Sequence, residues 1–235
     1  MIKHRLLLID LDDTLLSSTW FYDGLKKTIK IHPLTEKLDE VIFFEKMRNV
    51  PKYLLEKLTR KELTPLEFRR ERWRQSFAYF DVVYDIELLD EIDGLFLKIS
   101  MDYIIENKKL IDLLNDLQAH YQLGIVTNGL YDPRIKIKKM QLSVVFPDDC
   151  IFDAEQLGYR KPDQEIYLAA LNHFGKEPRE TLFIGDSWTH DIVGPMEVGM
   201  DAIWVNKKGI KKRTPHHPFA IVSDILEVRS ILLRN

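Results

Sequence analysis

Three carboxylates stand within four residues near the start of the chain, at Asp10, Asp12 and Asp13. Asp10 and Asp12 are two residues apart, so in extended backbone their side chains would point to the same side. Like charges that close repel, and one carboxyl can then have its pKa raised well above the ordinary value. An ionised carboxylate beside a protonated one can serve as a nucleophile beside a general acid. A plainer alternative is that these residues turn the chain and cap a helix.

A hydroxyl, an amide and a glycine follow the apolar run at 123–126, at Thr127, Asn128 and Gly129. These groups suit phosphate oxygens, although the same triplet is a common turn signal. Lys161 lies farther along, directly before a proline, where the backbone should be extended rather than helical. It is either a cation for the same site or one of many surface lysines.

Two more acids, Asp186 and Asp191, follow the apolar run at 181–184. Two carboxylates five residues apart, in a loop after a buried strand, suit a metal or catalytic site. Asp191 alone could equally cap the next helix. His216 and His217 stand near two prolines and are predicted to lie in a surface loop rather than in a metal site.

The elements that must position these side chains are predicted by short apolar runs at 5–9, 123–126, 151–152, 181–184 and 202–205, with an edge strand at 220–222. Apolar runs without alternation are typical of strands buried on both faces, as in a parallel sheet. Helical patterns separate them, including a last helix capped by Ser223 and a helix over 192–198. This second helix should be kinked or start late, because it carries Gly194 and Pro195. We therefore predict an α/β fold with a doubly wound parallel sheet of the Rossmann type. Ligands bind such a sheet beyond the carboxyl ends of its strands, where the polar residues stand.

The segment 17–99 differs from the rest of the chain in its composition and in its apolar pattern. It contains few glycines and has apolar residues at helical spacing, and Thr64 with Glu67 forms the pattern of a capping box. We predict an all-helical domain of four or five helices, inserted after the first strand. Residues 1–16 and 100–235 would then form the α/β core.

Charge and composition limit the kinds of partner and compartment that the chain suits. The stretch 46–74 carries a net charge of +6, which reflects either mutually paired helix faces or a basic surface for an anionic substrate. The whole chain has 235 residues and a formal net charge of −3, which gives no reason to expect nucleic acid or an anionic membrane as partner. Its one cysteine, Cys150, excludes an intramolecular disulfide and fits the cytoplasm. The sequence does not indicate an oligomeric state.

Taken in order and spacing, the motifs resemble those of the haloacid dehalogenase (HAD) superfamily of hydrolases over nearly the whole chain. The residues that resemble the first motif are Asp10, Asp12 and Thr14. Thr127 resembles the second motif, Lys161 the third, and Asp186 with Asp191 the fourth. The helical insertion is similar to the cap domain of subfamily I.

The resemblance implies a phosphatase that works through an aspartyl phosphate. Asp10 would attack phosphorus, and Asp12 would protonate the leaving oxygen and then activate water. Thr127, the backbone N–H of Asn128, and Lys161 would hold the phosphate oxygens.

The resemblance also implies magnesium, bound by the carboxylates of Asp10 and Asp186 and by the backbone carbonyl of Asp12. Asp191 would orient Asp186 or a metal-bound water. The substrate would be a small phosphorylated metabolite, such as a nucleoside monophosphate or a sugar phosphate. The aromatic residues at 20–22 could meet its leaving group beneath a helical lid, or could only pack the helical domain.

Three other functions are compatible with this resemblance. A phosphomutase would keep the same motifs but shield the phosphoenzyme from water. A haloacid dehalogenase shares the fold and the nucleophile but needs neither magnesium nor a second acid, so Asp12 and Asp186 count against it. A non-catalytic binding protein would be expected to lose Asp10, Asp12, Lys161 or Asp186, and all four are present.

Overall fold

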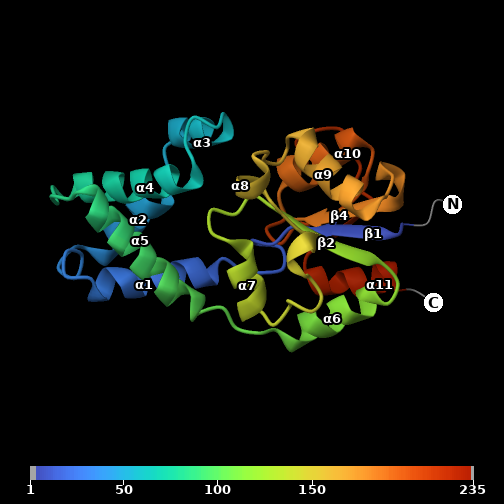
Figure 1. The fold of residues 1–235 in the computed structure, drawn as a ribbon, viewed down its shortest axis with the longest axis horizontal. Helices are drawn as coiled ribbons and strands as arrows, with labels where there is room; N and C mark the ends of the chain where they lie inside the picture. The colour runs from blue at the N-terminus through green and yellow to red at the C-terminus, as the bar shows by residue number, and fades with distance from the viewer. Residues whose placement is uncertain (1–3, 234–235) are drawn as a thin grey trace. The chain divides into compact units, whose positions relative to one another are not determined.

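The computed structural model describes residues 4–233, and the chain divides into two compact units (Figure 1). One unit comprises residues 1–17 and 106–235, and the other comprises residues 18–105. The helical domain was predicted to end at residue 99. Its last helix, α5 (Ile86–Met101), continues past that point, so the second junction falls between residues 105 and 106.

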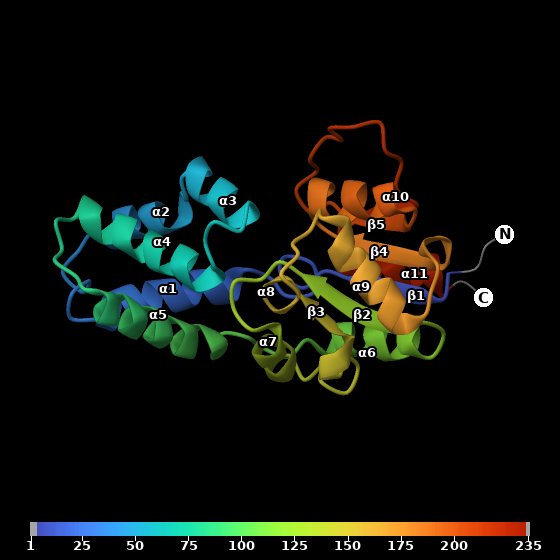
Figure 2. The same ribbon diagram turned by 45° about the horizontal axis from the view of Figure 1, so that its top comes forward.

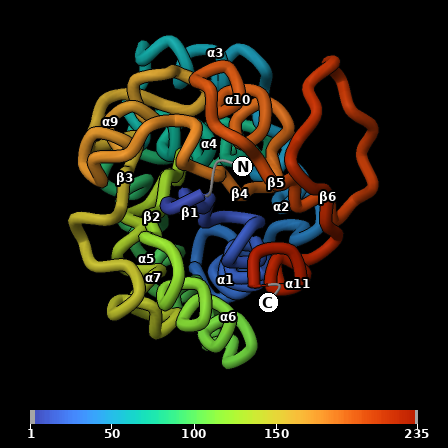
Figure 3. Tube along the Cα trace, turned by 90° about the vertical axis from the view of Figure 1, so that its right-hand side faces the viewer, coloured from blue at the N-terminus to red at the C-terminus, as the bar shows by residue number. Residues whose placement is uncertain are grey.

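Within the described residues, the first unit contains a six-stranded sheet in the order β3-β2-β1-β4-β5-β6, and every neighbouring pair is parallel. The strands are β1 (Leu6–Ile9), β2 (Gln122–Thr127), β3 (Ile151–Asp153), β4 (Thr181–Gly185), β5 (Asp201–Val205) and β6 (Ala220–Val222). Figure 3 shows them side by side in this order. The predicted parallel sheet is confirmed, with its edge strand at 220–222.

Helices cover both faces of this sheet. They are α6 (Lys108–Gln118), α7 (Pro133–Lys139), α8 (Ala154–Leu157), α9 (Gln164–Phe174), α10 (Gly194–Val198) and α11 (Val228–Leu232). In Figure 3, α9 and α10 lie on one side of the strands, and α6 and α11 lie on the other. The sheet is therefore doubly wound, and the apolar runs form strands because both of their faces are covered: every residue of β1 and of β4 is buried.

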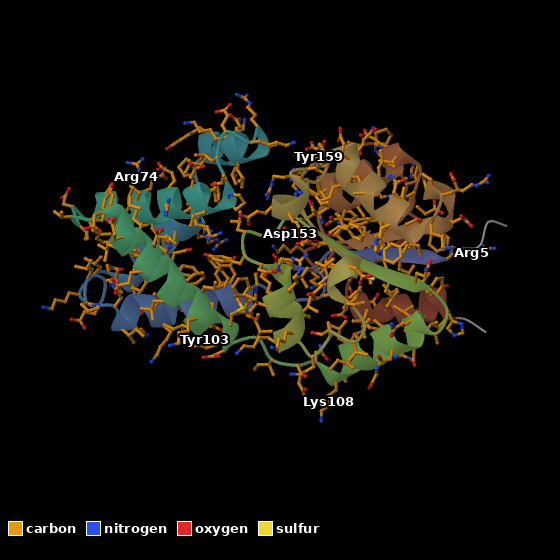
Figure 4. All side chains as sticks on the ribbon, viewed as in Figure 1. Arg5, Arg74, Tyr103, Lys108, Asp153 and Tyr159 are labelled. Atoms are coloured by element: carbon orange, nitrogen blue, oxygen red, sulfur yellow. The ribbon has the colours of Figure 1, made fainter. Side chains whose placement is uncertain are left out.

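Because all the strands run in the same direction, their carboxyl ends meet at one edge of the sheet. Figure 4 labels Arg5, directly before β1, and Asp153, the last residue of β3, toward opposite edges. Asp10 follows β1, Thr127 ends β2, and Asp186 follows β4. These three strands are adjacent in the sheet, so the fold brings the polar residues of three distant motifs together.

Two local details differ from the sequence predictions. Ser223 does not cap the last helical segment, because Asp224 accepts the backbone N–H of Leu226 (2.8 Å). The helix predicted over 192–198 is an α-helix only from Gly194, which agrees with the expected late start, but a π-helix over Trp188–Val193 precedes it and was not predicted. Ser187 caps its start, so the helical backbone begins before the apolar pattern that predicted it.

The described residues 18–105 form the all-helical unit that was predicted (Figure 2). Before α5 come α1 (Thr19–Ile31), α2 (Glu40–Arg48), α3 (Lys52–Thr59) and α4 (Pro65–Tyr79). The predicted capping box opens α4. Glu67 donates its backbone N–H to Thr64 Oγ1 (3.2 Å), and Glu67 Oε2 accepts the backbone N–H of Thr64 (2.8 Å). None of the described helices in either unit has the length and apolar character needed to cross a lipid bilayer.

The basic stretch at 46–74 is matched by acids of α5. Arg69 Nε lies 2.9 Å from Asp93 Oδ2, and Arg70 binds both carboxylate oxygens of Asp90 at 2.6 Å. These pairs favour mutually paired helix faces over an unpaired basic surface.

The aromatic residues at 20–22 pack inside the helical unit. The Phe21 ring meets the Phe96 ring edge-on, at 5.0 Å between centroids, and Tyr22 lies against Phe44 at 5.4 Å. A packing role therefore accounts for these two rings.

Two glycines in the helical unit make a matched test of its packing. A Cβ on Gly24 of α1 would lie 1.9 Å from Ser100 Oγ of α5, whereas one on Gly94 of α5 would meet nothing within 4 Å. We expect Gly24→Ala to lower the free energy of unfolding by about 1–3 kcal/mol, because the two helices must separate. Gly94→Ala should raise it by about 0.5–1 kcal/mol through helix propensity.

Urea unfolding of the two single variants measures both changes. An unchanged free energy of unfolding for Gly24→Ala would contradict the close contact between α1 and α5.

Candidate active site

Asp10 is held at the carboxyl end of β1 by contacts on both carboxylate oxygens. Its backbone N–H donates to the carbonyl of Ile184 in β4 (2.9 Å). Oδ1 accepts from Lys161 Nζ (2.7 Å), and Oδ2 accepts from Thr14 Oγ1 (3.0 Å). The residue is only 6% exposed. The predicted nucleophile is thus buried and oriented by two donors.

Lys161 is the buried cation of the site. Its Nζ donates to Asp10 Oδ1 and Asp191 Oδ1, both at 2.7 Å, and to the carbonyl of Val126 at 2.9 Å. The side chain is 2% exposed. Burial acts to lower the pKa of Lys161, but the two carboxylates raise it above its usual value, so the ammonium stays charged. The alternative of a surface lysine is therefore wrong.

Asp191 lies inside the π-helix that follows β4. Its Oδ2 accepts the backbone N–H of Ser187 (2.9 Å), while Oδ1 binds Lys161. Because Ser187 occupies the cap position, Asp191 does not cap the helix. Gly185 makes this approach possible, since a Cβ there would lie 2.4 Å from Asp191 Cβ.

Asn128 binds the backbone of Lys161 with both ends of its side-chain amide. Nδ2 donates to the carbonyl of Lys161, and Oδ1 accepts the backbone N–H of Lys161, both at 2.8 Å. Arg160 Nη2 in turn donates to the carbonyl of Asn128 (2.7 Å). The amide therefore positions Lys161, and the predicted phosphate donor of Asn128 is its backbone N–H.

Thr127 ends β2 and is 1% exposed. Its Oγ1 accepts the backbone N–H of Gly129 (3.1 Å), which is the turn geometry that the sequence also suggested. This contact orients the hydroxyl beside the loop that carries Asn128.

Asp186 joins Asp10 and Asp191 in one cluster. The carboxylate oxygens that these three residues offer all lie within 4.8 Å of one another. Thr14 Oγ1 lies between two of them, 3.0 Å from Asp10 Oδ2 and 3.5 Å from Asp186 Oδ1. Trp204 Nε1 fixes the backbone by donating to the carbonyl of Asp186 (2.9 Å).

The cluster holds more negative charge than Lys161 offsets. Burial raises the pKa of Asp10 to about 7, with repulsion from Asp191 added and the attraction of Lys161 opposing it. Burial and Asp191 likewise raise the pKa of Asp186 to about 6. Repulsion from Asp12 contributes least to the Asp10 pKa, so burial rather than the neighbouring acid accounts for most of the change predicted from sequence.

These residues fit a hard divalent cation. Clustered carboxylate oxygens are the ligands that Mg²⁺ takes, and the raised pKa values mark charge that a cation would neutralise. Asp10 and Asp186 were predicted as ligands, with Asp191 supporting them. The third predicted ligand was the backbone carbonyl of Asp12, whose carboxylate binds elsewhere.

Lys136 is a buried residue of the site that the sequence analysis missed. Its Nζ lies 2.8 Å from Oδ1 and 2.6 Å from Oδ2 of Asp12, and its side chain is 2% exposed. The sequence predicted only a short basic helix here. The helical spacing could have indicated that Lys136 is buried, because it lies on the same face as the apolar residues Pro133, Ile137 and Met140.

The chain is similar in sequence to known hydrolases. A model of the haloacid dehalogenase-like hydrolases matches residues 4–199. A pyrimidine 5'-nucleotidase of Streptococcus pneumoniae is 30% identical over 227 residues, which cover 92% of this chain and 89% of that protein.

Two solved structures share the fold. YfnB of Bacillus subtilis, solved bound to magnesium, has a TM-score of 0.77 at 23% identity, covering 98% of this chain and 99% of that one. A 2-haloacid dehalogenase from Pseudomonas syringae has a TM-score of 0.71 at 24% identity, with the same coverage. Identities this low show the architecture alone.

The raised pKa of Asp186 predicts that this residue destabilises the metal-free protein. The pKa of Asp186 is about 6 in the folded protein and about 4 in the unfolded chain. The free energy of unfolding therefore falls as the pH rises from about 4 to about 6, because the carboxyl ionises first in the unfolded chain. Asp186→Asn should therefore raise the free energy of unfolding at pH 8 by roughly 1–2 kcal/mol, with solvent screening allowed for. The gain should vanish near pH 4.

Thermal and urea unfolding in chelator, at several pH values, measures this gain. Asp112→Asn, at an exposed carboxylate of α6, is the matched control and should change little. A pH-independent effect of Asp186→Asn would contradict the electrostatic origin.

Proposed function

The chain belongs to the haloacid dehalogenase-like hydrolase family, as its motifs predicted, and from that premise we propose that it hydrolyses small phosphate monoesters with magnesium. One observation carries the proposal. The buried carboxylate of Asp10 lies 2.7 Å from Lys161 Nζ, in a cluster with the carboxylates of Asp186 and Asp191. The site therefore has a nucleophile, a fixed cation beside it in Lys161, and carboxylate ligands that could bind a second cation.

In the proposed first step, Asp10 attacks phosphorus, and the bond from phosphorus to the leaving oxygen breaks. Asp12 gives its proton to that oxygen, and the phosphoryl group stays on Asp10 as an acyl phosphate. In the second step, water attacks phosphorus and gives a proton to Asp12. Inorganic phosphate leaves, and the carboxylate of Asp10 is restored.

Charge neutralisation is the main demand on the site. At about 4 Å, one pair of like unit charges already costs about 4 kcal/mol at an effective dielectric of 20. Lys161 reduces this repulsion between Asp10 and a phosphate dianion. Mg²⁺, held by the carboxylates of Asp10 and Asp186 and the carbonyl of Asp12, would supply further neutralisation when bound. Thr127 and the backbone N–H of Asn128 would hold phosphate oxygens, and Asp191 would orient its neighbours.

Nucleoside 5'-monophosphates are the substrate class that we propose first. The pyrimidine 5'-nucleotidase of Streptococcus pneumoniae supports this choice, since it is similar to this chain over 92% of the length. Sugar phosphates are the second class. In this proposal the helical unit, residues 18–105, is a cap that selects the leaving group, and the enzyme works in the cytoplasm, which its single cysteine supports.

Dehalogenation of a 2-haloacid is the second candidate function, because a Pseudomonas syringae dehalogenase shares this fold. Such chemistry would use the same nucleophile but would have no need of Asp186 as a ligand or of Asp12 as an acid. The Asp10–Asp186–Asp191 cluster therefore favours phosphate esters.

A panel of nucleoside monophosphates and sugar phosphates, assayed for phosphate release with Mg²⁺, tests the proposal. We expect turnover that is lost in excess chelator and restored by Mg²⁺, because the carboxylate cluster needs a cation. Halide release from a 2-haloacid is assayed beside it. Halide release that persists in chelator, without phosphate release, would favour the dehalogenase instead.

Asp10→Asn should reduce phosphatase turnover by at least roughly 10³-fold, because the amide cannot attack phosphorus. The substitution is nearly isosteric and removes a buried charge, so the folded structure should persist. Initial rates in protein purified free of wild-type enzyme measure the loss, and acid-quenched wild type should carry substrate-derived phosphate that Asp10→Asn lacks. Activity within tenfold of Asp112→Asn would exclude Asp10 as the nucleophile.

A further inference from the structure

A second buried lysine, Lys136, binds Asp12, the second carboxylate of the loop that follows β1. Lys136 Nζ contacts both oxygens of Asp12, at 2.8 and 2.6 Å, across 124 residues of sequence. The lysine side chain is 2% exposed, whereas the Asp12 side chain is 33% exposed. One partner is therefore fixed inside the fold, and the other is open to a reacting group.

We propose that Lys136 is a positioning residue that holds the Asp12 carboxyl group where proton transfer to the leaving oxygen takes place. The inference rests on the proposed function, which gives Asp12 that task. Lys136 acts through Asp12, and its own contact with substrate is not required.

The burial of Lys136 argues against a purely structural role. Its neighbours on the buried face of α7, Pro133, Ile137 and Met140, are apolar, and an apolar side chain at position 136 would complete that face. Burying an ammonium costs free energy unless a charged partner compensates for it. The Lys136 ammonium contacts the solvent-accessible carboxylate of Asp12, and this ionised form is the one that Asp12 reaches as it gives its proton to the leaving oxygen. A purely structural role would not require a partner that faces solvent.

The surroundings of the pair are built to keep it in place. α7 is capped by Asp132, whose Oδ1 accepts the backbone N–H of Arg134 (2.9 Å), and Pro133 opens the helix. Gly129 leaves room for the carboxylate, since a Cβ there would lie 3.3 Å from Asp12 Oδ2. Helix and loop together therefore present Lys136 to one orientation of Asp12.

Lys161 cannot take over this task. Its three ammonium hydrogens already have three acceptors, on Asp10, Asp191 and Val126. A lysine on a different element is therefore needed for Asp12, and α7 provides it.

The test compares two leaving groups in the same protein preparation. One substrate is p-nitrophenyl phosphate, whose leaving group departs as a stable anion without a proton. The other is the best alkyl phosphate from the substrate panel, whose leaving oxygen needs the proton from Asp12. Lys136→Met should lower kcat/KM for the alkyl ester roughly 10- to 100-fold more than for the aryl ester, which is the size of a misplaced general acid.

Three further variants make the result specific. Lys138→Met, at an exposed lysine of the same helix, should leave both rates unchanged. Lys136→Arg restores the charge and should recover part of the alkyl-ester rate. In an Asp12→Asn background, Lys136→Met should not change the ratio of the two rates further, because the group through which it acts is gone.

Equal losses for the two esters, in an enzyme whose wild type turns over both, would overturn the inference while leaving the proposed function intact. A Lys136→Met effect on the ratio that persists in Asp12→Asn would also overturn it, by placing Lys136 on the substrate itself. Melting temperatures of the same variants measure the interaction between Lys136 and Asp12 independently of turnover. Melting-temperature changes that simply add across the Lys136–Asp12 cycle would likewise count against the pair.

Discussion

One buried ammonium group, Nζ of Lys161, holds the candidate active site together. Its acceptors are Asp10 after β1, Val126 in β2 and Asp191 after β4. Without this cation, two buried carboxylates would face each other in an environment that already raises the pKa of Asp10 to about 7. A buried charge persists only when it is paired and hydrogen-bonded. The three middle strands must therefore be in register for the site to form, and the site in turn constrains their ends.

Most of the fold and the main site residues could be predicted because a parallel sheet converts sequence order into spatial neighbourhood. Apolar runs buried on both faces mark the strands, and polar residues at their carboxyl ends must meet at one edge. Asp10, Thr127 and Asp186 follow this rule, since β2, β1 and β4 are adjacent. Lys161 belongs to no strand, and the family resemblance, rather than the pattern of strands, pointed to it.

The unpredicted parts depend on contacts that only the folded chain makes. The amide of Asn128 binds the backbone of Lys161, 33 residues away, and nothing in the triplet Thr-Asn-Gly indicates that partner. Asp224 caps in place of Ser223 because both are good caps and tertiary position decides between them. Lys136 was missed because a lysine among other lysines reads as surface, although its helical phase places it inside.

The two lysines also explain how neighbouring acids acquire different surroundings. Strand alternation does not govern Asp12, because the turn that follows β1 begins at Leu11. Asp10 is buried and shares Lys161 with Asp191, whereas the more exposed Asp12 has Lys136. A nucleophile and an acid need different environments more than they need distance. The fold provides that difference with cations from two separate elements, which is what the proposed mechanism requires of two carboxylates in one short loop.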